Sequence, residues 1–174
     1  MRRALTAAIL TLGVLAAFAP RADAVGLFGI WWDLDDADPN GYGAGFKGSR
    51  TLSQALSVDG RVSYVDFEDS DLAVIPLEAT LIGKLGRFVY IGIGYGYYFF
   101  EGGNAPENDF GWYYLGGIEV PFSGVAVFGE VRWLKLSADS NQPLPGAPGS
   151  TRADSSVNLD STTYHAGLSF SLPR

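Results

Sequence analysis

The sequence contains no cysteine and a single histidine, His165. Without cysteine the chain forms no disulfide, offers no thiol chemistry and cannot carry the lipid anchor of a bacterial lipoprotein. Long apolar runs are missing as well: after residue 24, the longest uncharged apolar segment is Phe88 to Phe100, which has 13 residues. A transmembrane helix needs about 20 apolar residues. Residence in a membrane would therefore have to come from β-strands.

The N-terminal segment has the pattern of a secretory signal peptide. Arg2 and Arg3 form a basic start, Ala4 to Ala19 is apolar and uncharged, and Ala22-Asp23-Ala24 has the small-x-small pattern that signal peptidase recognises. We therefore expect a signal peptide over residues 1–24 and one mature domain over residues 25–174. The signal implies export across the inner membrane.

Basic residues are scarce in the mature domain. The whole chain has 12 basic and 19 acidic side chains, of which Arg2, Arg3, Arg21 and Asp23 precede residue 25, so that 9 basic and 18 acidic ones remain. Such an acidic domain repels the phosphates of nucleic acids. Nucleic acid is therefore excluded as a partner.

Eight segments alternate between polar and apolar residues with the period of two that is typical of β-strands. They are rich in Val, Ile, Tyr, Phe, Trp and Gly, and they cover residues 26–35, 41–50, 54–67, 72–84, 87–100, 110–121, 124–138 and 160–172. Beyond the signal peptide, no stretch shows sustained helical periodicity. The third segment contains Asp59-Gly60, a frequent hairpin turn, and a turn there would give an odd number of strands. We expect a continuous strand instead, because Val58, Val62 and Tyr64 keep their alternation across it.

The connections between these segments alternate in kind. Those at 51–53, 84–87 and 121–124 are short, whereas those at 36–40, 68–71, 101–109 and 139–159 are mostly longer and more polar. Short turns at one rim and long loops at the other are typical of outer membrane barrels with both termini in the periplasm. The predicted fold class is all-β, an eight-stranded antiparallel up-and-down transmembrane β-barrel.

The segment Val125 to Leu136 indicates which face of the barrel is polar. Glu130 and Arg132 share one face of this strand, while Val127, Val131 and Trp133 share the other, since successive side chains point to opposite faces. A barrel in lipid turns the apolar face outward and encloses the polar one. The same analysis of the other segments predicts an enclosed ion-pair network of Asp33, Lys47, Asp59, Arg61, Glu78, Glu119, Glu130 and Arg132, with His165 also inside.

Aromatic residues at the long-loop ends of the strands predict a girdle at the membrane interface, where Trp and Tyr are enriched. Its members, all expected on the outer face, are Trp32, Tyr42, Tyr64, Phe99, Trp112, Trp133 and Tyr164.

Several stretches resemble the eight-stranded outer membrane β-barrel family, the OmpA-type transmembrane domain and its small relatives. They are Gly60-Arg61-Val62-Ser63-Tyr64-Val65-Asp66-Phe67, Ile75-Pro76-Leu77-Glu78-Ala79-Thr80, Tyr90-Ile91-Gly92-Ile93-Gly94-Tyr95-Gly96, Gly129-Glu130-Val131-Arg132-Trp133 and Tyr164-His165-Ala166-Gly167-Leu168-Ser169-Phe170. The resemblance covers the mature domain and marks an architecture, without pointing to one activity. Members of the family usually end in an aromatic residue that the barrel-assembly machinery recognises, whereas this chain continues past Phe170 to Pro173-Arg174.

Three patterns hint at specific sites, and each has a plainer interpretation. Gly92, Gly94 and Gly96 lack the third glycine and the helix of a nucleotide-binding loop, and we expect them to make room for bulky inner neighbours such as Trp31 and Tyr90. His165 is the best catalytic candidate, but Gly167 stands where a lipid A deacylase of this architecture has its serine, and Ser169 lies about 13 Å along the strand.

The third pattern is Asp36-Ala37-Asp38-Pro39-Asn40-Gly41, which begins like a calcium-binding loop. Lys47 stands where that loop has its last acidic ligand, and no helices flank it. A turn between strands is the plainer interpretation. Loose binding of divalent cations by the acidic loops, bridging lipopolysaccharide phosphates, stays open. We predict no catalytic residue, no cofactor and no specific metal site.

The expected function is therefore that of a non-enzymatic integral outer membrane protein with a filled polar lumen and a structural or surface-contact role. Its expected partners are the lipid bilayer, lipopolysaccharide and, during biogenesis, the barrel-assembly machinery. The alternative is a narrow channel or carrier for small apolar molecules, resembling the OmpW group. An apolar cavity with an opening in the wall would favour the carrier, and a continuous ion-pair network would favour the structural role.

Overall fold

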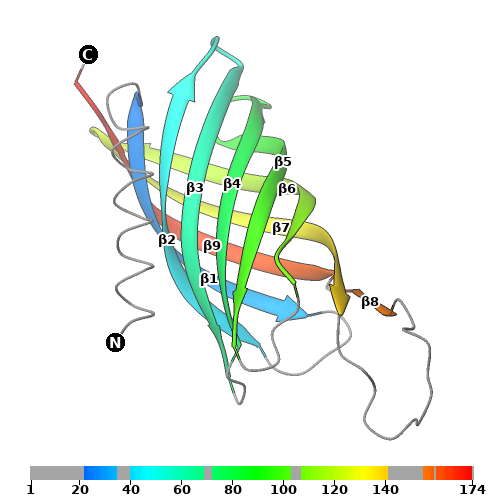
Figure 1. Cartoon of the computed structure of the whole chain (residues 1–174). Coiled ribbons are helices and arrows are strands. Elements are labelled where there is room, and N and C mark those ends of the chain that lie inside the picture. The colour runs from blue at the N-terminus through cyan, green and yellow to red at the C-terminus, as the bar shows by residue number, and fades with distance from the viewer. Residues whose placement is uncertain are drawn as a thin grey trace, which may run out of the picture.

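The computed structural model describes residues 22–34, 40–68, 72–102, 107–140, 155–158 and 160–173 (Figure 1). Its strands are β1 (Ala24–Leu34), β2 (Gly41–Thr51), β3 (Leu56–Phe67), β4 (Ala73–Lys84), β5 (Val89–Glu101), β6 (Asp109–Phe122), β7 (Val125–Ser140), β8 (Ser155–Asn158) and β9 (Ser161–Ser171). In this part of the chain, no helix has the length and apolar character needed to cross a membrane. Most of the predicted signal peptide and the calcium-like segment at 36–39 lie outside the described residues.

Eight of the strands close into an antiparallel barrel. β1 to β7 pair in sequence order, β7 pairs with β9, and β9 pairs with β1. The predicted eight-stranded antiparallel fold is thus confirmed. Asp59 pairs with Ser49 on one side and Thr80 on the other, so Asp59-Gly60 continues the strand as predicted. β8, which was not predicted, adds a short ladder to the end of β7.

The short connections and both ends of the barrel lie at one rim. In the turn from β2 to β3 the Leu52 amide donates to the Leu56 carbonyl at 2.9 Å, and in the turn from β4 to β5 the Leu85 amide donates to the Val89 carbonyl at the same distance. Ser123 and Gly124 join β6 to β7 with φ of 37° and 89°, the left-handed pair of a tight hairpin. Ala24, at the start of β1, pairs with Ser171 at the end of β9.

The faces of β1 are the reverse of those predicted. Trp32 is only 4% exposed and lies inside the barrel together with Phe28 and Ile30, whereas Trp31 is 44% exposed on the outer face. Trp31 pairs with Tyr164 and stacks on it, with ring centroids 5.2 Å apart. The prediction failed because β1 is apolar on both faces, so alternation alone cannot orient it. Trp32 is therefore no member of the outer girdle.

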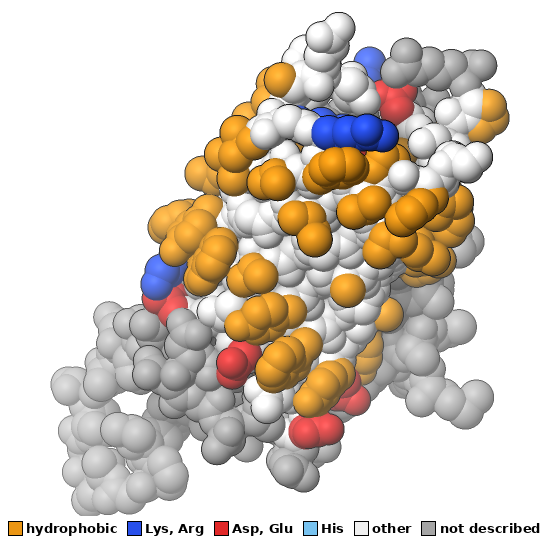
Figure 2. Space-filling model, turned by 180° about the vertical axis from the view of Figure 1, so that it is seen from behind, with side chains coloured by type: hydrophobic (Ala, Val, Ile, Leu, Met, Phe, Trp, Pro, Cys, Tyr) orange, Lys and Arg blue, Asp and Glu red, His pale blue; other side chains and the backbone are white. Residues whose placement is uncertain are grey.

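The outer wall is apolar between its two rims (Figure 2). Leu27, Ile91, Ile93, Val127 and Leu168 are exposed on it, and in Figure 2 the charged side chains of the visible face lie toward its ends. In a soluble protein this much exposed apolar surface would be unstable against association. A hydrocarbon environment accommodates it.

Aromatic side chains form stacked groups on this wall. Tyr114 stacks on Trp133 with centroids 5.1 Å apart, and Tyr95 stacks on Phe110 at 5.4 Å. Of the residues predicted for the girdle, the outer faces of their strands carry Tyr42, Tyr64, Phe99, Trp112, Trp133 and Tyr164. Trp31 takes the place that was predicted for Trp32.

Candidate functional site

The candidate site is the interior of the barrel, where strands from opposite walls bring charged side chains together. Arg61 on β3 donates from Nη1 to Glu130 Oε2 at 2.5 Å and from Nη2 to Glu130 Oε1 at 2.9 Å. The same Nη2 also donates to Asp59 Oδ2 at 2.9 Å. Both side chains of the Arg61–Glu130 pair are fully buried. Because β3 and β7 are four strands apart in both directions around the barrel, the pair joins opposite walls.

Arg132 extends these contacts to β4. Its Nη1 donates to Glu78 Oε2 at 2.8 Å, and its Nη2 donates to Glu130 Oε2 at 3.1 Å. Its guanidinium carbon also lies 4.8 Å from the centroid of the Tyr113 ring. Arg132 thereby links the two carboxylates into one continuous network.

Tyrosine hydroxyl groups complete the coordination of the carboxylates. Tyr90 donates to Glu130 Oε1 at 2.8 Å, and Tyr98 donates to Glu78 Oε1 at 3.0 Å. Buried charges are tolerated when they are paired and their remaining lone pairs are hydrogen-bonded. Lys47 joins the network more loosely, with Nζ 4.0 Å from Asp59 Oδ2. The network, meaning Lys47, Asp59, Arg61, Glu78, Glu130 and Arg132, carries three positive and three negative charges.

Two of the charged residues predicted for this network lie elsewhere. Asp33 follows the inward-facing Trp32, so alternation puts it on the outer face of β1, opposite Thr162 of β9. Glu119 faces the interior but lies nearer the short-turn rim, and among the described residues it forms no ion pair with Lys47. Asp33 was misplaced for the same reason as Trp32, since both depend on the orientation of β1.

The rest of the interior is apolar. Inward-facing residues between the network and the long-loop rim include Trp32, Val65, Val74, Leu134 and Leu136, and all are buried in one hydrophobic cluster. The sequence predicts a filled polar lumen, and the structure differs in the upper part of the barrel: a polar layer lies below an apolar plug. The sequence signal for the plug was the apolar inner face of β1 and of the upper parts of β3, β4 and β7.

Glycines on β5 and β6 make room for the tyrosines. A Cβ placed on Gly94 would lie 2.2 Å from Tyr113 Cζ, and one placed on Gly117 would lie 2.4 Å from Tyr90 Cζ. Gly94 and Gly117 therefore make room for Tyr113 and Tyr90, whereas Gly92 lies against Leu115 and Gly96 lies against Glu78 and Tyr98. Trp31, which was expected among them, lies on the outer face.

His165 is buried inside the barrel without the partners of a catalytic histidine. Its Nε2 lies 3.1 Å from Thr163 Oγ1, and its ring stacks on Phe28 with centroids 5.2 Å apart. No serine or carboxylate among the described residues forms a hydrogen bond with it. His165 therefore has the environment of a packed interior residue.

Two cavities of very different size flank the network. The upper one, lined by Trp32, Pro76, Tyr98 and His165 among others, measures about 10 Å³, close to the smallest space that holds one water molecule. The lower one measures about 360 Å³ and opens at the short-turn rim. We call this lower cavity the vestibule; its floor is formed by Lys47, Asp59 and Tyr90. The network and the plug close the barrel above it.

Solved structures with a similar fold include two outer membrane proteins. Neisserial surface protein A matches with a TM-score of 0.65 and 12% sequence identity, over 86% of this chain and 96% of that protein. The outer membrane protein OprG from Pseudomonas aeruginosa matches with a TM-score of 0.62 and 14% identity, over 88% of this chain and 98% of that protein. The fold is that of the eight-stranded outer membrane β-barrels. No protein-family model and no curated protein sequence matches the chain.

Proposed function

We propose that the chain is a non-enzymatic integral protein of the bacterial outer membrane, with a structural or surface-contact role in the envelope. The observation that carries the proposal is the continuous network from Lys47 to Glu78, buried between an apolar plug and the vestibule. Such an interior binds the strands together and leaves no path for a solute. The apolar outer wall supports a location in lipid.

Fractionation of cells tests the location. We expect the protein in the outer membrane fraction, with a mobility on gels that changes on heating as the barrel unfolds. Partition into the soluble periplasm would contradict the proposal. In planar bilayers the purified barrel should show no steady ion conductance, because the network fills the lumen.

The alternative of a carrier for small apolar molecules is favoured by one feature of the wall. The ladder between β3 and β4 is interrupted: Val62 pairs with Leu77 and Val65 pairs with Val74, but the ladder does not join Ser63 to Pro76, which lie opposite each other between these pairs. Pro76 lies in this gap, has no amide hydrogen to donate, and lines the upper cavity. A weakened seam beside an internal cavity is what a lateral exit would need.

The size of the upper cavity weighs against the carrier. At about 10 Å³ it holds no organic molecule. Uptake of a small apolar compound by vesicles that contain the barrel, compared with empty vesicles, distinguishes the two functions. Equal uptake supports the structural role, and faster uptake supports the carrier.

A further inference from the structure

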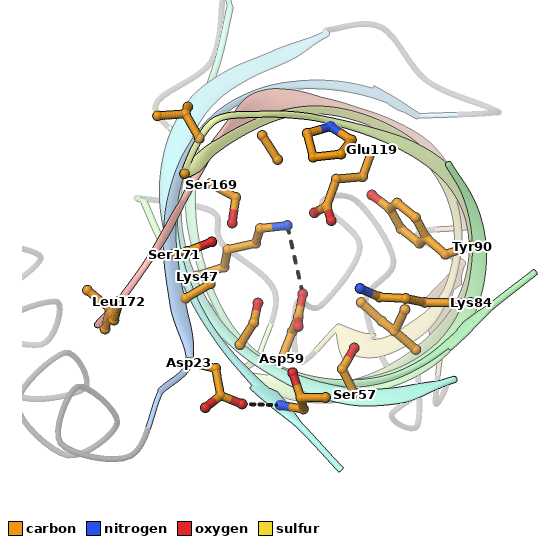
Figure 3. A pocket seen from close by; sticks show the side chains of 18 residues that line it. Asp23, Lys47, Ser57, Asp59, Lys84, Tyr90, Glu119, Ser169, Ser171 and Leu172 are labelled. Carbon is orange, nitrogen blue, oxygen red and sulfur yellow. Dashed lines mark hydrogen bonds and ion pairs between the residues drawn. The ribbon is translucent and has the colours of Figure 1, made fainter. Parts of the chain in front are cut away.

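The vestibule has the features of a binding site that the structural role leaves unexplained. Figure 3 looks into it, with side chains from several strands pointing into the open space. Its lining combines two lysines, Lys47 and Lys84, with Glu119 and with hydroxyl groups such as those of Ser57 and Ser169. A volume of about 360 Å³ is within the range of pockets for small molecules.

Lys47 is the most unusual group in this lining. The residue is 3% exposed, yet its ammonium donates no hydrogen bond to any described residue. The nitrogen lies 3.5 Å from the centroid of the Phe128 ring and 4.0 Å from Asp59, whose carboxylate already accepts a hydrogen bond from Arg61 at 2.9 Å. Figure 3 shows the nitrogen directed into the middle of the vestibule. An ammonium in this position needs an acceptor from a bound molecule or from solvent.

Glu119 supplies the opposite charge in the same space. Its carboxylate points into the vestibule from β6 (Figure 3). It forms no ion pair with any described residue, whereas the network carboxylates are engaged by arginines. A simple anion would be attracted by Lys47 but repelled by Glu119. A simple cation would be attracted by Glu119 but repelled by Lys47. A molecule with both charges satisfies both groups.

We propose that the vestibule binds a small zwitterion of the size of a free amino acid, which enters from the short-turn rim. Its carboxylate accepts hydrogen bonds from Lys47, and its ammonium donates to Glu119. The serine hydroxyls supply further polar contacts. The network closes the inner end, so the molecule binds and leaves by the same opening.

This binding site goes beyond the proposed function. It rests on the proposed function in one respect, namely the side of the membrane to which the vestibule opens. Asp23, which also lines the opening, precedes the predicted cleavage site and is not required.

The test is a titration of the isotopically labelled mature barrel in detergent micelles, followed by the amide resonances of β2, β3 and β6. The probe is glycine, compared with acetate and with methylammonium, which each carry only one of its charges. We expect saturable shifts with glycine at a Kd on the order of 1 mM, and binding of the single-charge compounds at least about tenfold weaker. Absence of saturable shifts at the vestibule, or equal binding of acetate and glycine, would overturn the proposal.

Substitutions assign the two charges. Lys47→Gln and Glu119→Gln should each weaken glycine binding about tenfold or more, because each removes one charge-assisted hydrogen bond. Lys135→Gln is the matched control, since Lys135 lies at the opposite rim beside Asp160 and its loss should leave binding unchanged. Heat-dependent gel mobility checks that each variant is folded, with Glu119→Gln as the safer variant because Glu119 lies outside the network. Unchanged affinity in folded Glu119→Gln and Lys47→Gln would refute the site, while the outer membrane location would stand.

Discussion

Arg61 on β3 and Glu130 on β7 form a bidentate ion pair across the full width of the barrel, although 69 residues separate them in the chain. Both side chains are out of contact with solvent. A planar guanidinium holds a carboxylate through two parallel hydrogen bonds, which fixes their distance and orientation. The pair therefore holds together two walls of the barrel that share no hydrogen-bonded ladder.

Removal of one partner should destabilise the barrel strongly. Arg61→Met leaves Glu130 with Arg132 and Tyr90, and among the described residues it leaves Asp59 with the distant Lys47 alone as its charged partner. Breaking a buried ion pair costs about 3–5 kcal/mol, because a charge is left without its partner. Unfolding by urea in lipid vesicles, followed by gel mobility, measures the effect. Arg50→Met is the control, since Arg50 is exposed at the rim and should change stability little.

The double variant Arg61→Met with Glu130→Leu separates two explanations of that loss. If the cost comes from an uncompensated charge, removing both partners restores part of the stability. If the cost comes from lost packing, the double variant is at least as unstable as Arg61→Met alone. We expect partial recovery.

A second prediction concerns the glycines that make room for tyrosine rings. Gly94→Ala places a methyl group 2.2 Å from Tyr113, and we expect a loss of stability of about 1–3 kcal/mol from overpacking. Gly116→Ala is the matched control on the neighbouring strand, because nothing lies within 4 Å of its added methyl group. Urea midpoints of the two variants, measured side by side, check the prediction. Equal midpoints would show that the interior adapts without strain.

The eight barrel strands, their approximate limits and the polar face of most of them followed from alternation. In β7, for example, the charged Glu130 and Arg132 differ sharply from Val131 and Trp133. β1 had no such contrast. Its two faces are both apolar, and its orientation is set by pairing with β2 and β9, which place Trp31 between Tyr42 and Tyr164. The sequence also did not reveal which residues of the network pair with each other, since Arg61 and Glu130 meet only after the barrel closes. Nor does alternation reveal the vestibule, which depends on which inner side chains are short.

The orientation of β1 gives a third prediction. In a variant that keeps only Trp31 of the four tryptophans, brominated lipid should quench the fluorescence strongly, because this ring is exposed on the outer wall. In a variant that keeps only Trp32, brominated lipid should quench weakly, because this ring packs against Phe67 and Tyr98 inside the barrel. Phenylalanine replaces the removed tryptophans in both. The reverse result would restore the faces that alternation alone suggested.

The interrupted ladder at Pro76 gives the last prediction. Pro76→Ala supplies an amide hydrogen in the gap between the Val62–Leu77 and Val65–Val74 pairs. Both neighbouring pairs already share one register, so the new donor can join the ladder without a shift of either strand. We expect slower amide hydrogen exchange at Ser63, which lies opposite position 76, and a gain in stability of about 1 kcal/mol, the usual net value of one hydrogen bond. Ile82→Val, in the paired part of the same strand, controls for changes that come only from an altered interior side chain. If Pro76→Ala instead accelerates exchange along β3 and β4, the proline ring is needed to pack the wall and the seam is a rigid element. Unchanged exchange would mean that the gap is too far open for a single donor to close, which would strengthen the carrier alternative.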